Sequence, residues 1–426
     1  MYVKPKRPTV FYGWWVVGAS SLISLYTAGV IHFGFTAVFE PIANEFGWSY
    51  VQISLAASLR GLETGLLAPI VGMLVDRWGS RKLVLGGIVI SGLGLVLLSR
   101  INSLGMFYAA FILIAIGISS SSATVFLTTL VHWFRRNLGI ATGIATSGFA
   151  LGGLLVPLMT TLIDTYGWRT SMFSLGLGVW LIGVPLSLLI RNTPEQYGYL
   201  PDGDESKSSA IDERHPPTHR PEVDIAARQA LKSSAFWHIA PAFMCQIMVI
   251  NAVVVHVMPY LSSLGISRAA SSFVASAIPV ASILGRLSSG WFADRLDKKR
   301  AAATGFVLTG LGLLLFSFIS PGRLWVVLPF LLLFGIGWGA SVTMRVSLLR
   351  EHFGRKIFGT VHGFTLGVTM VGNIIGPPLA GWVYDKWGSY QGIWLALVGV
   401  SAVSVLIVAL TPPVSNRTQL GDKQNA

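Results

Sequence analysis

Twelve long apolar segments restrict what this chain can fold into. Each is close to the ~20 residues that a helix needs to cross about 30 Å of hydrocarbon. In lipid only helices and closed barrels satisfy their backbone hydrogen bonds, and these segments are too long and too continuously apolar for barrel strands. The sequence therefore predicts an all-α integral membrane protein, with transmembrane helices at 12–36, 51–75, 83–99, 104–130, 137–163, 168–190, 236–260, 270–292, 301–319, 324–349, 357–384 and 389–411.

The composition agrees with a lipid environment. Only 12% of the 426 residues are charged, whereas soluble proteins carry about 25%. The 47 glycines favour close helix packing in a bilayer. Lys4, Lys6 and Arg7 precede the first span as in a signal peptide, but that span is long and aromatic and no small-residue cleavage site follows it. We therefore interpret it as a retained helix.

The net charge of +13 is explained by topology and not by nucleic acid. With the N-terminus inside, most of the 31 lysines and arginines fall in inner segments. This asymmetry predicts a multi-pass protein of the cell (inner or plasma) membrane with both termini in the cytoplasm. The exceptions are Arg100, Arg169, Arg268, Arg323 and Lys386 in outer segments, and Arg60, Arg286 and Arg345 within spans.

One polar stretch divides the chain. Residues 191–235 are rich in Pro, Ser and mixed charges, and they predict a partly disordered cytoplasmic linker. The expected domains are a six-helix bundle at 1–190, this linker, a second six-helix bundle at 236–412 and a cytoplasmic tail at 413–426. The single cysteine, Cys245, excludes an intramolecular disulfide and a thiol metal cluster.

The two bundles repeat one pattern at a nearly constant spacing. Parallel halves of this kind place a substrate site at their interface, near the midplane of the bilayer. The matching positions are Gly72 with Gly290, Asp76 with Asp294, Arg77 with Arg295, Gly139 with Gly359, Pro157 with Pro378, Asp164 with Asp385 and Gly167 with Gly388.

The segment between the second and third spans carries a family motif. It reads Gly72-x-x-x-Asp76-Arg77-x-Gly79-x-Arg81-Lys82 and resembles the inter-helix signature of the major facilitator superfamily. The resemblance implies two pseudo-symmetric six-helix bundles and a gate latch at this motif. Gly72 would allow close packing, Asp76 would pair with a cation on a neighbouring helix, and Gly79 would turn the chain. The second copy, at Gly290, Asp294 and Arg295, has Asp297 in place of the turn glycine.

A finer resemblance is to the branch of monocarboxylate transporters and oxalate–formate antiporters. The opening Tyr12-Gly13-Trp14-Trp15-Val16-Val17 is similar to the start of that branch, and Gly285-Arg286-x-x-x-Gly290 is similar to its buried arginine followed by glycine. The resemblance implies that Arg286 binds the substrate carboxylate. The chain has Ser282 where animal carriers have an aspartate, and His32 and Gly34 where they have a lysine.

Charges inside a membrane cost about 2.5–3.5 kcal/mol each on insertion scales, so each needs a partner or a function. Arg286 has no acid nearby in its own span, and a guanidinium can hold a carboxylate with two parallel hydrogen bonds. The alternative is a structural pair with another helix. Arg345 is open to three interpretations: it extends to the headgroups, it is a second anion contact, or it pairs at the gate.

The candidates for proton coupling are Glu63, Arg60, His32 and His362. Arg60 and Glu63 lie three residues apart on one helix face, where they either neutralise each other or Glu63 carries a proton. His32 and His362 can titrate near neutral pH, but lone helix histidines are more often structural.

Polar side chains within other spans are weaker candidates for substrate contact. They are Ser120, Ser121, Asn251 and Trp338. Small-residue helix packing explains the serines equally well.

Together these features predict a secondary transporter of a small organic anion, a monocarboxylate such as lactate or pyruvate. It would work by alternating access, driven by proton symport or anion exchange. The alternative is an exporter of another metabolite or drug in the same fold. A membrane-embedded enzyme would need clustered acids or histidines, and a sensor would bind without flux. No P-loop is present, so ATP is not the direct energy source. We expect no cofactor, metal or nucleic acid, and a functional monomer.

We expect Glu63→Gln to retain exchange but to lose substrate accumulation under a proton gradient. Glutamine keeps the shape and hydrogen bonds of the side chain but cannot carry the proton. Tracer uptake into proteoliposomes, with and without the gradient, measures both. Accumulation that survives the substitution would show that Glu63 only neutralises Arg60.

Overall fold

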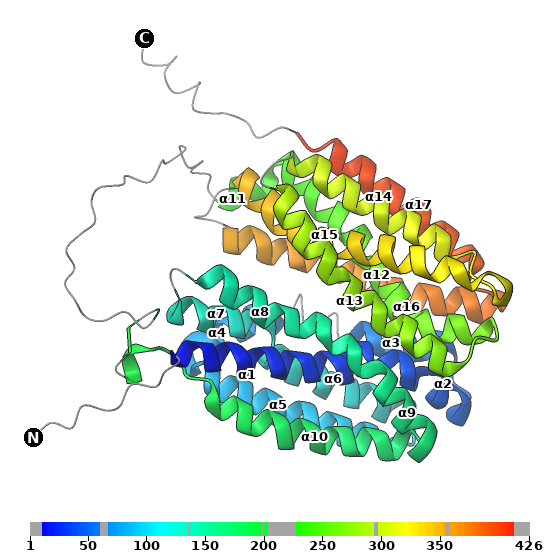
Figure 1. The fold of residues 1–426 in the computed structure, drawn as a ribbon, viewed down its shortest axis with the longest axis horizontal. Helices are drawn as coiled ribbons and strands as arrows, with labels where there is room; N and C mark the ends of the chain where they lie inside the picture. Colours follow the sequence, from blue (N-terminus) through cyan, green and yellow to red (C-terminus); the bar gives the residue numbers. More distant parts are fainter. Residues whose placement is uncertain are drawn as a thin grey trace, which may run out of the picture. The chain divides into compact units, whose positions relative to one another are not determined.

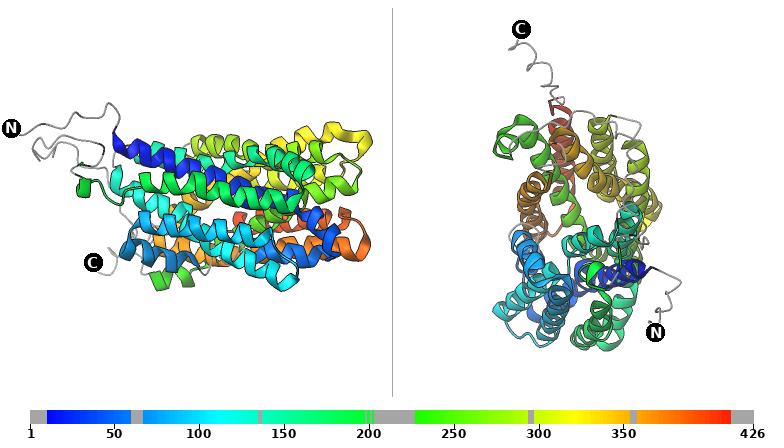
Figure 2. Two further views of the ribbon diagram at one scale, coloured as in Figure 1. Left: turned by 90° about the horizontal axis from the view of Figure 1, so that it is seen from below. Right: turned by 90° about the vertical axis from the view of Figure 1, so that its left-hand side faces the viewer.

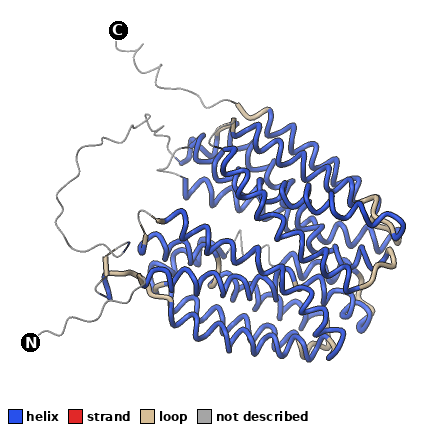
Figure 3. Tube along the Cα trace, viewed as in Figure 1, coloured by secondary structure: helices blue, strands red, loops and turns tan. Residues whose placement is uncertain are grey.

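The computed structural model describes residues 11–59, 67–134, 137–197, 199–200, 202, 227–293, 297–353 and 358–412. Within these ranges the chain forms helices and loops and no strand (Figure 3). Eleven helices there are long and apolar enough to cross a membrane. The predicted span 51–75 corresponds to α3 (Tyr50–Leu59) and α4 (Ala68–Trp78), and residues 60–66 between them lie outside the described ranges. The predicted all-α membrane fold is confirmed.

The helices, which are labelled in Figure 1, group into two compact units. Unit 1 contains residues 1–38 and 66–209, and unit 2 contains residues 39–65 and 210–426. The helix α2 (Phe35–Phe46) begins in unit 1 and ends in unit 2. Residues of the first two spans therefore pack with the C-terminal helices. The expected domain boundaries at residues 190, 235 and 412 stay a prediction.

Unit 1 is a bundle whose long helices run roughly parallel or antiparallel to one another (Figure 2). A π-helical turn at Ala28–Phe33 follows its first helix, and two short 3₁₀ turns lie at Gly152–Leu155 and Glu195–Tyr197. The described α-helices of this unit are α1 (Tyr12–Thr27), α4, α5 (Ser80–Leu98), α6 (Leu104–Ser120), α7 (Ala123–Trp133), α8 (Leu138–Leu151), α9 (Val156–Tyr166) and α10 (Trp168–Leu189).

Unit 2 is built in the same way, with a 3₁₀ turn at Pro321–Val326 before one of its long helices. Its described α-helices are α3, α11 (Ala227–Lys232), α12 (Ser234–Ser263), α13 (Arg268–Ala293), α14 (Lys298–Phe316), α15 (Val327–Phe353), α16 (Phe358–Trp387) and α17 (Gln391–Ala409).

Two predicted spans differ in outline from the structure. The first does not end at residue 36 but continues through Pro41 to Phe46. The span 104–130 is broken between α6 and α7, at Ser121 and Ser122. The hydroxyls of Ser120 and Ser121 donate to the carbonyl groups of Ile116 and Gly117, at 3.1 and 3.2 Å. Serine side chains that bond the preceding turn in this way often bend or interrupt helices.

The outer faces of the helices are apolar. Leu181 of α10 is 78% exposed and Leu287 of α13 is 69% exposed. Exposed apolar surface of this kind needs lipid to cover it. The interior of unit 2 is aromatic: the ring of Phe316 packs on those of Phe330 and Trp394, at centroid distances of 4.5 and 5.3 Å.

Glycine allows α8 to approach α1 closely. A Cβ atom added at Gly148 would overlap the carbonyl oxygen of Ser21. The chain then bends into the 3₁₀ turn that begins at Gly152. Gly143 lies in the same helix, but a Cβ atom there would meet nothing within 4 Å.

We expect Gly148→Ala to lower the free energy of unfolding by about 1–3 kcal/mol, because the added methyl forces two backbones apart. Gly143→Ala in the same helix is the matched control and should leave stability unchanged or slightly higher. Thermal unfolding of the purified protein in detergent measures both. Equal melting temperatures for the two variants would contradict the close approach.

Candidate functional site

Two half-buried arginines lie in unit 2. Arg286 is on α13 and Arg345 is on α15. The Nε atom of each is buried and has no hydrogen-bond partner among the described residues. A buried donor without a partner costs about 1–3 kcal/mol, and more when the group is charged. Each of the two side chains therefore has a donor that is free to bind an acceptor, such as an oxygen atom of a ligand.

Close backbone contact between α13 and α15 fixes the position of Arg286. A Cβ atom added at Gly339 would overlap the carbonyl oxygen of Ser282 and lie 2.7 Å from the backbone nitrogen of Arg286. Arg345 follows on α15, where the helix rises about 9 Å from Gly339 to Arg345. The two arginines thus lie along one pair of packed helices, more than a turn apart.

The ion pairs described in unit 2 lie away from these two arginines. Among the residues that the structure describes, the ion pairs of unit 2 are Arg268 with Glu40 and Lys298 with Glu351, each at 3.3 Å. Neither involves Arg286 or Arg345. His362 of α16 lies close enough to Arg345 for their charges to interact. An anion is the ligand that such a site would stabilise.

The other predicted substrate contacts bond within their own helices or are buried. The Asn251 side chain of α12 donates to the carbonyl of Ile247 at 3.0 Å. Trp338 of α15 is 5% exposed. Ser120 and Ser121 belong to unit 1, where their hydroxyls bond to the preceding turn. Each hydroxyl keeps lone pairs that can still accept a hydrogen bond.

The coupling candidates are only partly described. Arg60 and Glu63 lie outside the described residues. His32 of unit 1 lies in the π-helical turn Ala28–Phe33, with its ring 5.0 Å from Phe33 and 5.1 Å from Phe149. A π-helical turn inside an α-helix often marks a functional position. Their coupling roles stay predictions.

The predicted gate motif forms a tight turn in unit 1. Gly79 joins α4 to α5 with φ of 79°, a conformation that favours glycine. Arg77 and Lys82 are exposed, and Arg81 is half-buried. Gly72 and Asp76 are in α4, but their surroundings are outside what the structure describes.

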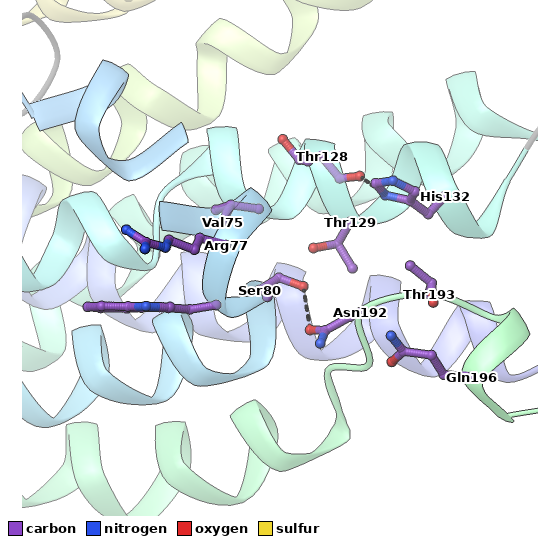
Figure 4. Close-up of a pocket in the computed structure, with 11 residues that line it drawn as sticks. Val75, Arg77, Ser80, Thr128, Thr129, His132, Asn192, Thr193 and Gln196 are labelled. Atoms are coloured by element: carbon purple, nitrogen blue, oxygen red, sulfur yellow. Dashed lines mark hydrogen bonds between the residues drawn. The ribbon is translucent and has the colours of Figure 1, made fainter. Parts of the chain in front are cut away.

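A pocket of about 350 Å³ lies beside this turn (Figure 4). Ser80 and Asn192 face each other at its edge, and Thr129 and His132 of α7 form the opposite wall. Arg77 points away from the other labelled residues.

The second copy of the motif is described only at its edges. Gly290 is in α13, whereas Asp294 and Arg295 lie outside the described residues. Asp297, which replaces the turn glycine, caps α14 by accepting from the backbone nitrogens of Lys299 (2.8 Å) and Arg300 (3.3 Å). The substitution therefore exchanges a glycine turn for an N-cap.

Sequence reasoning missed His256 of α12, which is fully buried. Its Nε2 lies 2.9 Å from the Pro377 carbonyl and 2.9 Å from Ser54 Oγ. A carbonyl only accepts, so Nε2 carries the proton, and Nδ1 accepts from the Tyr390 hydroxyl at 2.9 Å. The position of His256 within a predicted span was the available signal. Its three partners lie on distant segments, which no local pattern reveals.

A second missed feature joins α3 to α16. The carboxylate of Asp385 accepts hydrogen bonds from the backbone nitrogens of Tyr50 (3.0 Å) and Val51 (2.9 Å), at the N-terminus of α3. A negative charge is favourable at this end of a helix. The sequence marks Asp385 only as the repeat partner of Asp164.

Comparison with known proteins identifies the family of this chain. The family model of the Major Facilitator Superfamily matches residues 18–366 and 257–425. Monocarboxylate transporter 12-B of Danio rerio is 25% identical, over 97% of this chain and 90% of that protein. Monocarboxylate transporter 2 of Mus musculus is 26% identical, over 92% of this chain and 82% of that protein.

The fold resembles a solved structure as well. A bacterial homolog of the human lysosomal transporter Spinster, in an inward-facing and occupied conformation, superposes with a TM-score of 0.72. It is 15% identical, and the match covers 95% of this chain and 97% of the other. This likeness shows the fold alone.

We expect His256→Phe to destabilise the protein by about 1–3 kcal/mol for each polar group that it leaves unpaired in the interior. His238→Phe is the matched control in the same helix, because among the described residues His238 is found bonded to the carbonyl of Ser234, at 2.6 Å, in its own first turn. Chemical unfolding in detergent would compare the two. A His256 variant as stable as the control would rule out the described hydrogen bonds.

Proposed function

We propose that this chain, which belongs to the major facilitator superfamily, carries a small organic anion whose carboxylate binds Arg286. Transport of a small molecule across a membrane, and not catalysis, follows from the family. The observation that supports an anion is the buried Nε atom of Arg286, which has no partner among the described residues. A charge inside a membrane is retained where it binds a substrate or another charge.

The chemistry of the guanidinium favours a carboxylate. Arginine offers a planar pair of N–H donors that matches the two oxygens of a carboxylate, and lysine does not. The close contact of α13 with α15 beside Arg286 restricts the backbone that presents it. A site held in place in this way loses less entropy when it binds.

The relatives narrow the proposal to a monocarboxylate. Two of them, matched over most of their length and of this chain, are named monocarboxylate transporters. At 24–26% identity a substrate is not transferred by similarity alone, so lactate and pyruvate are the first compounds to test. Arg345 is a second cation on the same pair of packed helices. A substrate with a further hydrogen-bond acceptor would bind it as well.

Two driving forces are compatible with this site. In proton symport Glu63, His32 or His362 would carry the proton, with Arg60 beside Glu63. In anion exchange the positive charge of Arg286 would be neutralised by one anion or the other in each transit. The proposal further includes a monomer that works by alternating access in the cell membrane, with both termini in the cytoplasm. An exporter of another metabolite or drug is the outcome to expect if anions are not carried.

We expect Arg286→Lys to reduce carboxylate counterflow at least about tenfold, because lysine cannot form the two parallel hydrogen bonds. Arg286→Ala should abolish it. Arg350→Lys, an exposed arginine near the end of the same α15 helix that carries Arg345, is the control and should transport normally.

Proteoliposomes preloaded with unlabelled lactate and tested with a ladder of radiolabelled anionic, neutral and cationic compounds measure this. Normal uptake by Arg286→Lys would exclude two-point binding of the carboxylate. Uptake of cations or neutral compounds instead of anions would favour the exporter.

A further inference from the structure

The chain that follows α10 folds back onto unit 1. The Arg191 guanidinium lies between the rings of Tyr12 (3.8 Å) and Tyr197 (4.1 Å). The backbone carbonyl of Arg191 accepts a hydrogen bond from the Trp133 indole at 2.9 Å. Residues 191–197, expected to begin a partly disordered linker, are thus an ordered part of this unit.

An aromatic clasp holds this segment in place. We define it as Phe11, Tyr12, Trp133, Phe134, Tyr197 and Tyr199. The ring of Tyr12 lies 5.6 Å from that of Trp133 and 6.3 Å from that of Tyr199. The Tyr12 hydroxyl donates to the carbonyl of Leu189 at 3.0 Å. Cation–π and aromatic pairs contribute most where water is excluded, and Trp133 is fully buried.

Asn192 extends from this clasp to the turn that carries the gate motif. Its Oδ1 atom accepts from the Ser80 hydroxyl at 3.2 Å and from the Arg81 backbone nitrogen at 3.1 Å. A Cβ atom added at Gly79 would overlap the same amide group. Glycine is therefore needed at residue 79 for two reasons, its positive φ and the space that Asn192 occupies.

The two hydrogen bonds matter for the position of the turn because a pocket lies beside it. On the side that faces Thr129 and His132, about 350 Å³ of open space replaces packed side chains (Figure 4). A turn bordered by a cavity loses the many small contacts that normally fix a loop. Its position then depends on the directed hydrogen bonds that Asn192 supplies.

We infer that Asn192 is a positioning residue of the gate turn, and that it couples the segment after the sixth span to the gate. The inference rests on the proposed transport function, in which the motif acts as a latch. A residue that positions the turn of a latch affects how well the latch closes, and a change in latch closure shifts the balance between the two access states. The apparent affinities at the two faces of the membrane then move apart.

The contact itself is tested without transport. In a Cys245→Ser background, which removes the single cysteine, Thr129→Cys places a thiol at a buried position of the pocket wall. We expect Asn192→Ala to speed its reaction with N-ethylmaleimide by roughly tenfold, because a local opening now exposes it. Asn192→Asp retains the acceptor oxygen and should restore the slow rate.

Two controls separate this effect from general loosening. Gln196→Ala changes a residue of the same pocket for which no hydrogen bond to the turn is found among the described residues, and it should leave labelling unchanged. Ser91→Cys, at a fully buried position of α5, should react slowly in every variant. Equal labelling of Thr129→Cys with Asn192 and with Ala at residue 192 would overturn the inference, as would a parallel rise at Ser91→Cys.

Transport measurements then distinguish a role of Asn192 in the gate from a purely structural role. With lactate as the probe, the ratio of KM values in inside-out and right-side-out vesicles should change roughly three- to tenfold in Asn192→Ala and return with Asn192→Asp. An unchanged ratio together with faster labelling would show a structural role only and overturn the inference. If the unmodified protein takes up none of the probes, the proposed function fails, and labelling alone decides whether Asn192 holds the turn.

Discussion

Hydrocarbon supplies no hydrogen bonds, so polar groups within the transmembrane helices need partners inside the protein. The helix α16 contains Pro377 and Pro378 and is nevertheless continuous from Phe358 to Trp387. Pro378 has no N–H for the carbonyl of Ile374, and the hydroxyl of Ser58 donates to that carbonyl at 2.8 Å. His256 binds the carbonyl of Pro377. Ser58 of α3 thus replaces one of the donors that the proline pair removes, and His256 of α12 adds a hydrogen bond at the same point of the helix.

Arg286 and Arg345 differ from the other buried groups without a hydrogen-bond partner because they carry a charge. The hydroxyls of Ser20, Ser119 and Ser271 also lack a hydrogen-bond partner among the described residues, but the Nε atoms of the two arginines belong to cations. Burial of a cation without a counter-charge is unfavourable in the absence of ligand. An anion that relieves this cost gains affinity from it, which is how a transporter can bind a small, strongly hydrated carboxylate.

The fold was predictable because hydropathy and span length act locally. Eleven spans are where the sequence places them, and the differences are at ends and breaks, such as the continuation past Pro41 to Phe46. The position of Arg286 within a transmembrane helix was also predictable, since a single charge in an apolar run is visible in the sequence; its role in binding stays a proposal. Glu63 was identified in the same way, although its surroundings are not described.

The contacts that organise the ends of the helices were not predictable. His256 binds residues near positions 54, 377 and 390, and Asn192 binds the turn at Ser80. Such pairs depend on which helices are neighbours and on their register, and neither follows from the composition of a single segment. Charge and proline content suggested a disordered linker from residue 191, but tyrosines at 12 and 197 order its first residues.

The aromatic clasp also has a consequence for biosynthesis. Tyr12 leaves the ribosome before α10 is made, whereas Arg191 and Tyr197 follow α10 in the chain. Domains generally fold as units in N- to C-terminal order during synthesis, but the contacts of Tyr12 with Arg191 and Tyr199 cannot form until the chain has grown past Tyr199. The N-terminal unit is therefore complete only when the first residues of the connecting segment have emerged.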